Sequence, residues 1–326
     1  MQLRDLFIIS ADDRADRVLT RLLPLLSGCR YPLRTRHSSS ENWTVVTDQD
    51  HDQMDNHLTE MDGLKEGEPL YSSLGKPPAS GPLTSAHQLK DEEVQKLDGL
   101  LEDIGRGDMV LILMDMERKD GHISASYLSE RAMIQGAFSL GFVLRTGQFR
   151  DMSHIEDLNR ELLSLSRSFN GFVGIPPRAI MEGRNIDLAH LIRHLTDMAF
   201  TPGIVNLDHA DLMLTSKGGS ILVITWGAAR PGGNRAATSV KDALTKSLCD
   251  VDLRSVRKAL VNVVGSGDLT LEDSLVASGV LKKRIRPNSH IIWGVSLVEG
   301  MEEDMEVFLI LATTPMELLL HWYSHD

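Results

Sequence analysis

Three polar side chains in one short stretch of the chain have the types needed to bind and polarise water. Asn206, Asp208 and Asp211 lie just after the Pro-Gly pair at 202–203. Carboxylates can take a proton from an attacking water, and an amide can orient it. Asn and Asp are also favoured helix caps, and Asp is stabilised near a helix N-terminus by the helix dipole. Spacing alone favours capping, so a catalytic interpretation depends on the surrounding sequence.

A second candidate for chemistry is a pair of histidines four residues apart. His190 and His194 lie in a segment with the apolar periodicity of a buried helix. This spacing could place two imidazoles on one metal ion. The segment has no HExxH pattern and the sequence offers no evident third ligand. We therefore predict core or surface histidines and no metal site.

Size and charge limit the classes of function. The chain has 326 residues, 42% of them hydrophobic and 25% charged, and a formal net charge of -12. This length favours two domains with a sizeable core. The negative charge argues against a nucleic-acid partner, which would need a concentrated basic face. One basic cluster is predicted to be a solvated turn; it comprises Lys282, Lys283, Arg284 and Arg286.

The sequence predicts a cytoplasmic protein that does not insert into a membrane. No apolar run reaches the length of about 18 residues that spans a bilayer, and the N-terminus has no signal-peptide pattern. The two cysteines, Cys29 and Cys249, are far apart and show no metal-ligand spacing. They are predicted to be free thiols in a reducing compartment.

Strand and helix patterns alternate in the first half, which predicts an α/β fold with a doubly wound, mostly parallel sheet. Residues 48–90 are polar and rich in Gly, Pro, Ser and Asp, so we expect long, flexible loops there. Strands are predicted at 6–9, 43–47, 109–114, 142–144 and 172–175. The first strand is followed by a turn and then by a helix that ends by residue 26, and further helices are predicted at 91–104, 127–140 and 155–168.

A central helix is expected to join this sheet domain to a smaller α+β domain. The predicted domains are 1–180, a linking helix at 181–202 with its apolar face over 186–199, a second domain at 203–314 and a tail at 315–326. Strands in the second domain are predicted at 221–226, 260–264, 291–297 and 307–312. The apolar, aromatic segment 315–323 is expected to pack on its own domain or to dock onto a partner.

Several segments of the second half resemble the FtsZ/tubulin family in family order. Residues 202–211 read Pro-Gly-Ile-Val-Asn-Leu-Asp-His-Ala-Asp, which resembles the family's catalytic synergy loop. Residues 232–236 resemble its Gly-Glu-Asn-Arg-Ala helix start, 259–271 its Asn-Ile-Thr-Gly-Gly segment with Asp-Leu-Thr-Leu, and 289–294 its Ala-Asn-Ile-Ile-Phe-Gly strand. The resemblance implies a tubulin/FtsZ-like fold whose first domain is a Rossmann-type GTPase-like unit.

The glycine-rich phosphate loops of that family are missing from the first half. Residues 10–16 read Ser-Ala-Asp-Asp-Arg-Ala-Asp, and residues 115–123 read Asp-Met-Glu-Arg-Lys-Asp-Gly-His-Ile. Glycine matters in such loops because backbone N–H groups must approach the phosphate closely. Only Gly121 remains of the second loop. We therefore expect a degenerate nucleotide site, no bound cofactor, and loss of GTP and GDP binding.

Charge reinforces this expectation. Two unit charges about 4 Å apart interact by roughly 4 kcal/mol near a protein surface. Acidic side chains beside a triphosphate would therefore weaken its binding, and the neighbouring cations would offset only part of the loss. The acidic residues are Asp12, Asp13, Asp115 and Glu117, and the cations are Arg14, Arg118 and Lys119.

The residues that recognise the guanine base in the family are also only partly matched in this sequence. Residues 175–178 read Ile-Pro-Pro-Arg, one residue shorter than the family's Ile-Pro-Asn-Asp-Arg, and Met181 takes the place of the aromatic that stacks on guanine. Asn185 matches the family's guanine-reading position, although a surface helix residue is an equal alternative. Thr47 and Asp48 resemble the family's Asn-Thr-Asp only weakly.

In the family, the nucleotide lies on one face of a subunit and the synergy loop of the next subunit completes the hydrolytic site. The resemblance therefore implies that Asn206, Asp208 and Asp211 act in trans, with the two aspartates polarising water and the asparagine orienting it. We predict a divergent cytoskeletal protein without autonomous GTPase activity that regulates or caps filaments of a true FtsZ, head-to-tail. The alternatives are a self-assembling GTPase with altered loops and a nucleotide-independent polymer of the chain itself.

Overall fold

The fold was examined in a computed structural model that describes most of the chain. The described residues are 6–22, 26, 33–37, 44–46, 88–180, 185–200, 204–207, 209–230, 232, 234–246, 248–298, 301 and 305–325. The loops predicted at 48–90 therefore lie outside the described residues, apart from 88–90.

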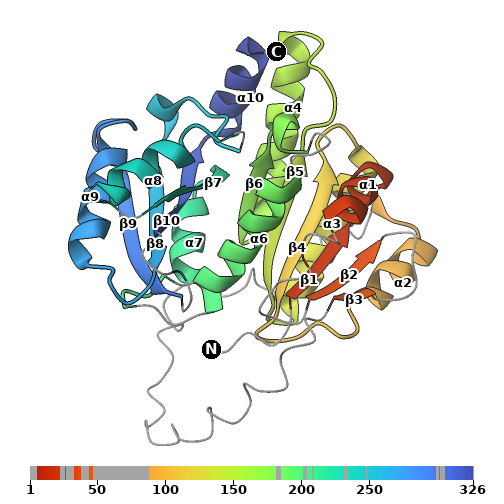
Figure 1. The fold of residues 1–326 in the computed structure, drawn as a ribbon. Helices are drawn as coiled ribbons and strands as arrows, with labels where there is room; N and C mark the ends of the chain where they lie inside the picture. The colour runs from red at the N-terminus through yellow and green to blue at the C-terminus, as the bar shows by residue number, and fades with distance from the viewer. Residues whose placement is uncertain are drawn as a thin grey trace, which may run out of the picture.

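Ten strands in the described residues form one continuous sheet, in the order β3-β2-β1-β4-β5-β6-β7-β10-β8-β9 (Figure 1). The strands are β1 (Leu6–Ser10), β2 (Leu33–His37), β3 (Thr44–Val46), β4 (Met109–Asp115), β5 (Phe138–Leu144), β6 (Gly171–Ile175), β7 (Ile221–Ala229), β8 (Lys258–Gly265), β9 (His290–Leu297) and β10 (Met305–Thr313).

The pairing confirms a doubly wound sheet in the first half and a mixed sheet in the second. Strands β2, β1, β4, β5 and β6 pair in parallel, with β3 antiparallel at the edge. Strand β10 runs antiparallel to both β7 and β8, and β9 is parallel to β8. The two halves share one sheet because β6 and β7 pair in parallel at Val173 and Leu222.

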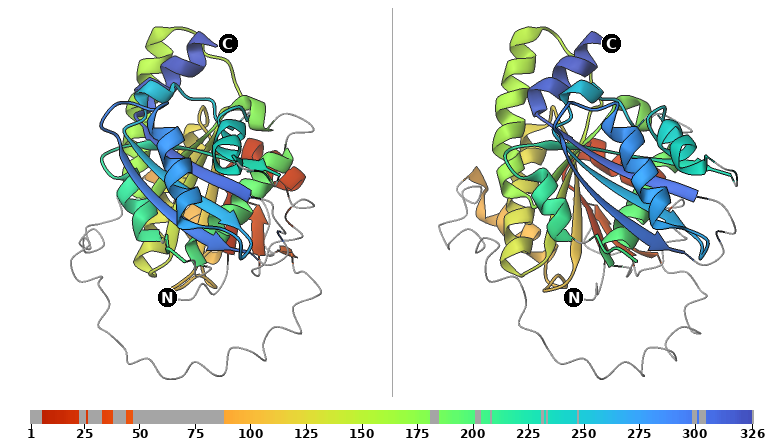
Figure 2. Two further views of the ribbon diagram at one scale, coloured as in Figure 1. Left: turned by 60° about the vertical axis from the view of Figure 1, so that its left-hand side comes forward. Right: turned by 90° about the vertical axis from the view of Figure 1, so that its left-hand side faces the viewer.

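Helices cover both faces of the sheet (Figure 2). Alternate residues of each buried strand face opposite sides, so Phe7 packs in one core and Ile8 in the other. Helices α1, α6 and α7 pack on the Ile8 side, and α2, α3, α4, α8, α9 and α10 on the Phe7 side. Their bounds are α1 (Asp13–Leu22), α2 (Asp91–Gly99), α3 (Lys119–Ile134), α4 (Met152–Leu165), α6 (Asn185–Phe200), α7 (His209–Ser216), α8 (Arg235–Ala243), α9 (Leu271–Lys282) and α10 (Pro315–Ser324), with short helical turns α5 (Pro177–Ile180), η6 (Ser166–Ser168) and η7 (Leu253–Ser255).

The largest error in the predicted elements concerns α3. The helix was expected at 127–140, but it begins at Lys119 and ends at Ile134, and β5 then begins at Phe138. Its buried face is made largely of small residues such as Ala125, Ser129 and Ala132. Small residues let the helix pack closely on the sheet, but they do not produce the periodic pattern of large apolar side chains from which a helix is predicted. Helix α2 likewise ends at Gly99 rather than near 104.

The tail packs on its own protein. Helix α10 lies beside α4, and Leu318, Leu319 and Trp322 are buried. The indole N–H of Trp322 donates to the Asp250 carbonyl at 2.9 Å. This confirms the prediction of self-packing for these residues. Tyr323 remains 40% exposed on the outer side.

The structure also bears on the cysteines, the basic cluster and the membrane prediction. Cys249 is a free thiol, and burial raises its pKa to about 12, while Cys29 lies outside the described residues. The basic cluster at 282–286 is exposed apart from buried Ile285, as expected of a solvated turn. In the described part of the chain, no helix combines the length and apolar character needed to cross a bilayer.

Candidate functional site

The loop between β1 and α1 places a buried carboxylate at the N-terminus of the helix. Asp12 is 5% exposed. Its Oδ1 accepts hydrogen bonds from the backbone N–H groups of Arg14 and Ala15, both at 2.9 Å. These donors belong to the first turn of α1, where a helix has unpaired N–H groups and a partial positive charge. The side chain of Asp12 therefore occupies a position that an external anion could otherwise use.

The same carboxylate bridges to the next loop of the sheet. Oδ2 of Asp12 accepts a hydrogen bond at 2.8 Å from the backbone N–H of Asp115, the last residue of β4. A Cβ on Gly121 would lie only 2.7 Å from this oxygen. Gly121 stands in the first turn of α3, so the absence of a side chain there makes room for Asp12. The one glycine kept from the family's second loop thus contacts a carboxylate of the protein itself.

Asp115 is the centre of a second set of contacts. It is fully buried, and its Oδ1 accepts from the backbone N–H of Glu117 at 2.9 Å. The guanidinium of Arg14 lies 3.4 Å from the same oxygen and donates to Thr146 Oγ1 at 2.9 Å. Thr146 in turn hydrogen bonds to Asp115 Oδ2. The carboxyl ends of β1, β4 and β5 are therefore joined by their own side chains.

A buried histidine connects this network to helix α4. His122, on α3, is 3% exposed; its Nε2 lies 2.8 Å from the Asp115 carbonyl and its Nδ1 lies 2.9 Å from Glu161 Oε1 on α4. The ring of His122 therefore links the carboxyl end of β4 to helix α4. The hydrogen bond from His122 lowers the pKa of Glu161, against the opposing effect of burial. The spacing of His122 and Glu161 along the chain does not predict this contact, because the two residues lie 39 positions apart.

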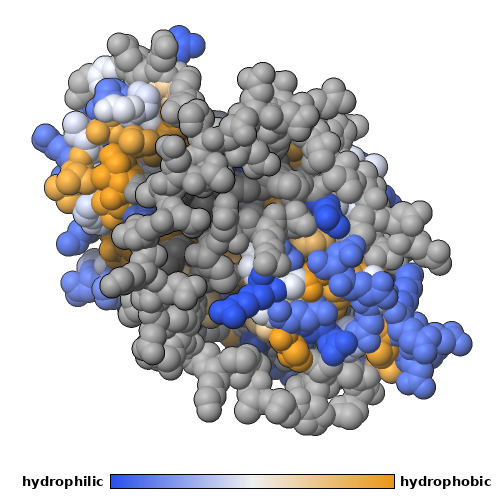
Figure 3. Space-filling view, turned by 90° about the horizontal axis from the view of Figure 1, so that it is seen from below, coloured by the Kyte–Doolittle hydropathy of each residue, from blue (hydrophilic) through white to orange (hydrophobic). Residues whose placement is uncertain are grey.

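The loop that resembles the synergy loop lies at the opposite end of the molecule. Helix α6 starts after the carboxyl end of β6 and its 16 residues span about 24 Å. The chain then reaches Ile204–Leu207 and α7. Figure 3 shows this end of the molecule. Orange apolar atoms gather on its left-hand side, where the C-terminal strands lie in Figure 1, and the coloured atoms on its right-hand side are mainly blue. Ile204 is one exposed apolar residue of the loop, 53% accessible.

Backbone pairing fixes this loop to β9. Val205 forms an antiparallel bridge with Val295, with N···O distances of 3.3 and 3.0 Å. The neighbouring Leu207 is buried. A Cβ on Gly294 would lie 2.4 Å from Leu207 Cγ and 2.8 Å from the Val205 carbonyl oxygen. The absence of a side chain at Gly294 therefore leaves space for the loop to pack against β9.

The predicted site residues are only partly described. Asn206 is exposed, and Asp211 is half-buried in the first turn of α7, the dipole-stabilised position that the capping interpretation expects. Asp208 lies outside the described residues, and Asn185 begins α6 but its side chain is not described. Asn206 and Asp211 follow the C-terminal end of α6, whereas Asp12 and Asp115 lie at the carboxyl ends of β1 and β4.

Two of the family-like segments meet in space. Arg235, at the start of α8, contacts Asp268 through Nη1 and donates from Nη2 to Asp273 Oδ2 at 3.2 Å. Asp273 also accepts from the N–H of Thr270 at 3.0 Å, in a capping box that starts α9. Burial alone would raise the pKa of Asp273, but the hydrogen bonds from Thr270 and Arg235 lower it. These motif residues join two helices.

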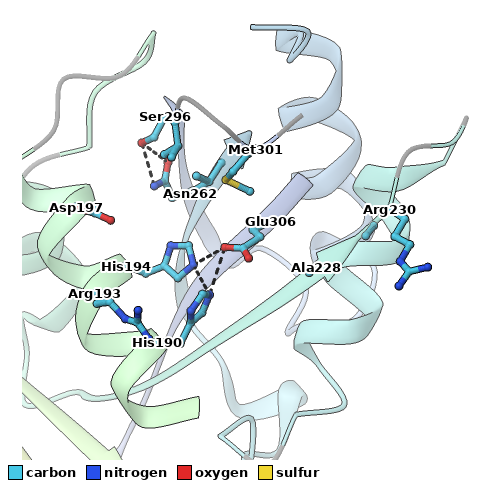
Figure 4. Close-up of a pocket in the computed structure, with 13 residues that line it drawn as sticks. His190, Arg193, His194, Asp197, Ala228, Arg230, Asn262, Ser296, Met301 and Glu306 are labelled. Carbon is cyan, nitrogen blue, oxygen red and sulfur yellow. Dashed lines mark hydrogen bonds and ion pairs between the residues drawn. The ribbon is translucent and has the colours of Figure 1, made fainter. Parts of the chain in front are cut away.

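The histidine pair has a third partner that the sequence did not reveal. His190 and His194 on α6 face Glu306 on β10, at Nε2···Oε2 distances of 3.3 and 2.6 Å (Figure 4). Glu306 was not evident from the sequence as a possible third ligand because it lies 116 positions beyond His190. Burial by itself would raise the pKa of Glu306, but hydrogen bonds from His190 and His194 outweigh it and lower that pKa to about 2.

Comparison with known proteins agrees with the segments that the sequence analysis singled out. Residues 220–314 match the family model "FtsZ family, C-terminal domain". Cell division protein FtsZ 1 of Halobacterium salinarum is 28% identical over 240 residues, which cover 70% of this chain and 60% of that protein. The match thus spans about 60% of the length of this curated relative.

Solved structures share the fold. CetZ from Methanosaeta thermophila superposes with a TM-score of 0.63 at 13% identity, covering 99% of this chain and 90% of the other. CetZ2 from Haloferax volcanii, described as a GTPγS-bound protofilament, gives a TM-score of 0.54 at 14% identity, covering 72% and 74%. These findings show that residues 220–314 are similar to the C-terminal domain of the FtsZ family and that the fold as a whole is similar to that of CetZ.

Proposed function

We propose that this chain is an FtsZ-like cytoskeletal protein of the cell-division type that does not bind or hydrolyse GTP on its own. The observation that carries the proposal is the position of the Asp12 carboxylate, between the first turn of α1, the N–H of Asp115 and Gly121. Backbone donors that could hold a phosphate at this edge of the sheet are already paired with this carboxylate. The relatives named cell division protein FtsZ support the cytoskeletal class.

Electrostatics adds to the argument. A phosphate at this edge would meet Asp12 and Asp115, both buried and both in hydrogen-bonded networks. Each acidic group about 4 Å from a phosphate oxygen would oppose binding by roughly 4 kcal/mol. Arg14 is the nearest described cation, and it contacts Asp115 at 3.4 Å. The site is thus better suited to its own side chains than to a triphosphate.

Equilibrium binding of GTP and GDP in the presence of Mg²⁺ tests this proposal. The purified protein is first checked for nucleotide that co-purifies with it. We expect no binding at millimolar nucleotide. Tight binding would contradict the proposal and make a self-assembling GTPase with altered loops the leading function.

We further propose that the loop at 204–211 docks head-to-tail onto the nucleotide face of an FtsZ-like subunit. Asn206 and Ile204 are exposed there, and the bridge from Val205 to β9 holds the loop in place. The protofilament assembly of the CetZ2 neighbour supports contacts of this kind. Because the opposite face lacks an open phosphate site, the protein would cap a filament or regulate its turnover.

The docking proposal predicts a separable catalytic effect. In a GTPase assay with the FtsZ of the same genome, the protein should stimulate hydrolysis if the loop reaches bound GTP. Substituting Asp208 and Asp211 together by Ala should abolish stimulation while leaving capping largely intact. The matched control substitutes two exposed acidic residues elsewhere, Glu102 and Glu156. Unchanged stimulation in the loop variant would remove the catalytic role.

A nucleotide-independent polymer of the chain itself is the second candidate. Lys119 and Asp13 are exposed, which leaves them available for salt-linked contacts between copies, whereas Arg118 pairs with Asp120 of its own chain at 3.1 Å. Asp12 and Arg14 are likewise engaged within the chain. Assembly that ignores GTP but collapses with added salt would favour this candidate.

A further inference from the structure

Three metal-ligating side chains converge between the central helix and the C-terminal part of the sheet. Nε2 of His190 and Nε2 of His194 are 2.9 Å apart, and Glu306 Oε2 lies within 3.3 Å of both. Figure 4 shows the two rings and the carboxylate pointing toward one another beside a cavity of about 630 Å³. None of the three residues belongs to the phosphate-loop network or to the loop at 204–211.

The donor types and their spacing suit zinc. Zn²⁺ binds imidazole nitrogen and carboxylate oxygen at about 2.0–2.2 Å, with two histidines and one glutamate as a known set that leaves a fourth position open. Tetrahedral ligands at these lengths are about 3.3 Å from each other. The observed separations of 2.6, 2.9 and 3.3 Å require shifts of less than about 1 Å.

Aromatic neighbours hold both rings in place. The ring centroid of His190 is 4.0 Å from that of Trp226, and His194 stacks on Phe308 with centroids 5.5 Å apart. His194 is only 8% exposed. Packing of this kind fixes ligand orientation before a metal binds, which reduces the cost of assembling the site.

We propose that His190, His194 and Glu306 form a Zn²⁺ site that joins α6 to β10. The fourth position faces the cavity, which is lined in part by Asn262, Ser296 and Met301, and a water molecule would complete the coordination there. The ion links the central helix to a strand of the second half, so it stabilises the relative placement of α6 and the C-terminal strands.

Direct titration tests the site. The probe is Zn²⁺ added to untagged protein stripped with a chelator, followed by calorimetry, with Co²⁺ as a spectroscopic substitute. We expect one ion per chain and a visible Co²⁺ spectrum of low coordination number. Mg²⁺ should not compete, because it prefers six oxygen ligands. Absence of stoichiometric Zn²⁺ binding would overturn the proposal and leave a purely hydrogen-bonded cluster.

Variants assign the ion to these residues. Glu306→Gln keeps the side-chain size and His190→Asn shortens the side chain. Each should weaken Zn²⁺ binding by more than the roughly 10–100-fold that loss of a supporting partner costs. His290→Asn, at an exposed histidine on β9, is the matched control and should bind Zn²⁺ as the parent does. Equal binding by all variants would place the ion elsewhere and overturn the assignment.

Trp226 provides a readout that does not depend on any ligand substitution. Its ring contacts that of His190, so Co²⁺ at the site should quench the fluorescence of this tryptophan. The Trp226→Phe variant should keep Co²⁺ affinity within about threefold while losing most of the quenching. Persistent quenching in that variant would locate the ion near a different tryptophan, and the proposal would fail.

Discussion

The two ends of the central helix carry acidic residues in opposite settings. At the carboxyl ends of β1 and β4, Asp12 and Asp115 are buried and accept hydrogen bonds from backbone N–H groups, and Asp115 also contacts Arg14 and Thr146. At the other end, Asn206 is exposed and Asp211 is half-buried at the start of a helix. Both ends use the same chemistry of carboxylates near helix N-termini.

This difference in burial shows that the residue type alone does not reveal whether a carboxylate near a helix N-terminus has a structural or a functional role. The Asp12 carboxylate lies where the first turn of α1, the N–H of Asp115 and Gly121 meet, so it is part of the protein's own structure. The loop near Asn206 is instead held from behind by Val205 and Leu207, which leaves its outer side open. Substitutions at the two ends should therefore have different consequences.

The largest effect is expected where the exposed loop is anchored. Gly294→Ala places a methyl group 2.8 Å from the Val205 carbonyl oxygen and closer still to Leu207. The backbone must move, so we expect a loss of about 3 kcal/mol in the free energy of unfolding. Urea denaturation measures it. A loss below about 0.5 kcal/mol would show that the loop is not held against β9.

The closed end should respond next. Asp12→Ala removes the acceptor for three backbone N–H groups, those of Arg14, Ala15 and Asp115. We expect a loss of about 2 kcal/mol, because a missing helix cap and unpaired buried donors each destabilise. The neighbouring Asp13→Ala, at an exposed position, is the control and should change stability by less than about 0.5 kcal/mol. Equal effects of the two substitutions in urea denaturation would contradict the structural role of Asp12.

A third prediction concerns the region that joins α8 to α9. The pKa of Asp273 is lowered in the folded protein, so its carboxylate stabilises the fold above its usual value of 3.8 and this contribution is lost as the pH falls through the lower native value. Asp273→Asn should cost about 1 kcal/mol at neutral pH. The gap between the two proteins should close in strong acid. Thermal unfolding of both proteins as a function of pH measures this difference in stability. A difference that grows on acidification would contradict a stabilising role of the Asp273 carboxylate.

The smallest effect on stability is expected at the exposed end. Asp211→Ala removes a favourable charge from the first turn of α7 and should cost only about 0.3–1 kcal/mol. Chemical denaturation checks this value. A cost above about 2 kcal/mol would show that Asp211 serves chiefly as a structural group, which would weaken its assignment to docking.

Much of the fold could be predicted because local patterns are strong. Buried strands such as Met109–Asp115 read as continuous apolar runs, and helix α6 has a clear apolar face. Helix α3 was misplaced because its buried face uses small residues, and small residues carry little periodic signal. The loss of glycines at 10–16 was also visible from the sequence.

The sequence by itself determined the family resemblance, the alternation of strands and helices, and the replacement of glycines by charged residues. Only the tertiary structure decided what those charges contact, since Asp12 and Asp115 are 103 positions apart and meet through parallel strand pairing. The same holds for Glu306, which reaches His190 across 116 positions. Such contacts depend on strand order and helix placement, and these arise from long-range packing that residue spacing along the chain does not encode locally.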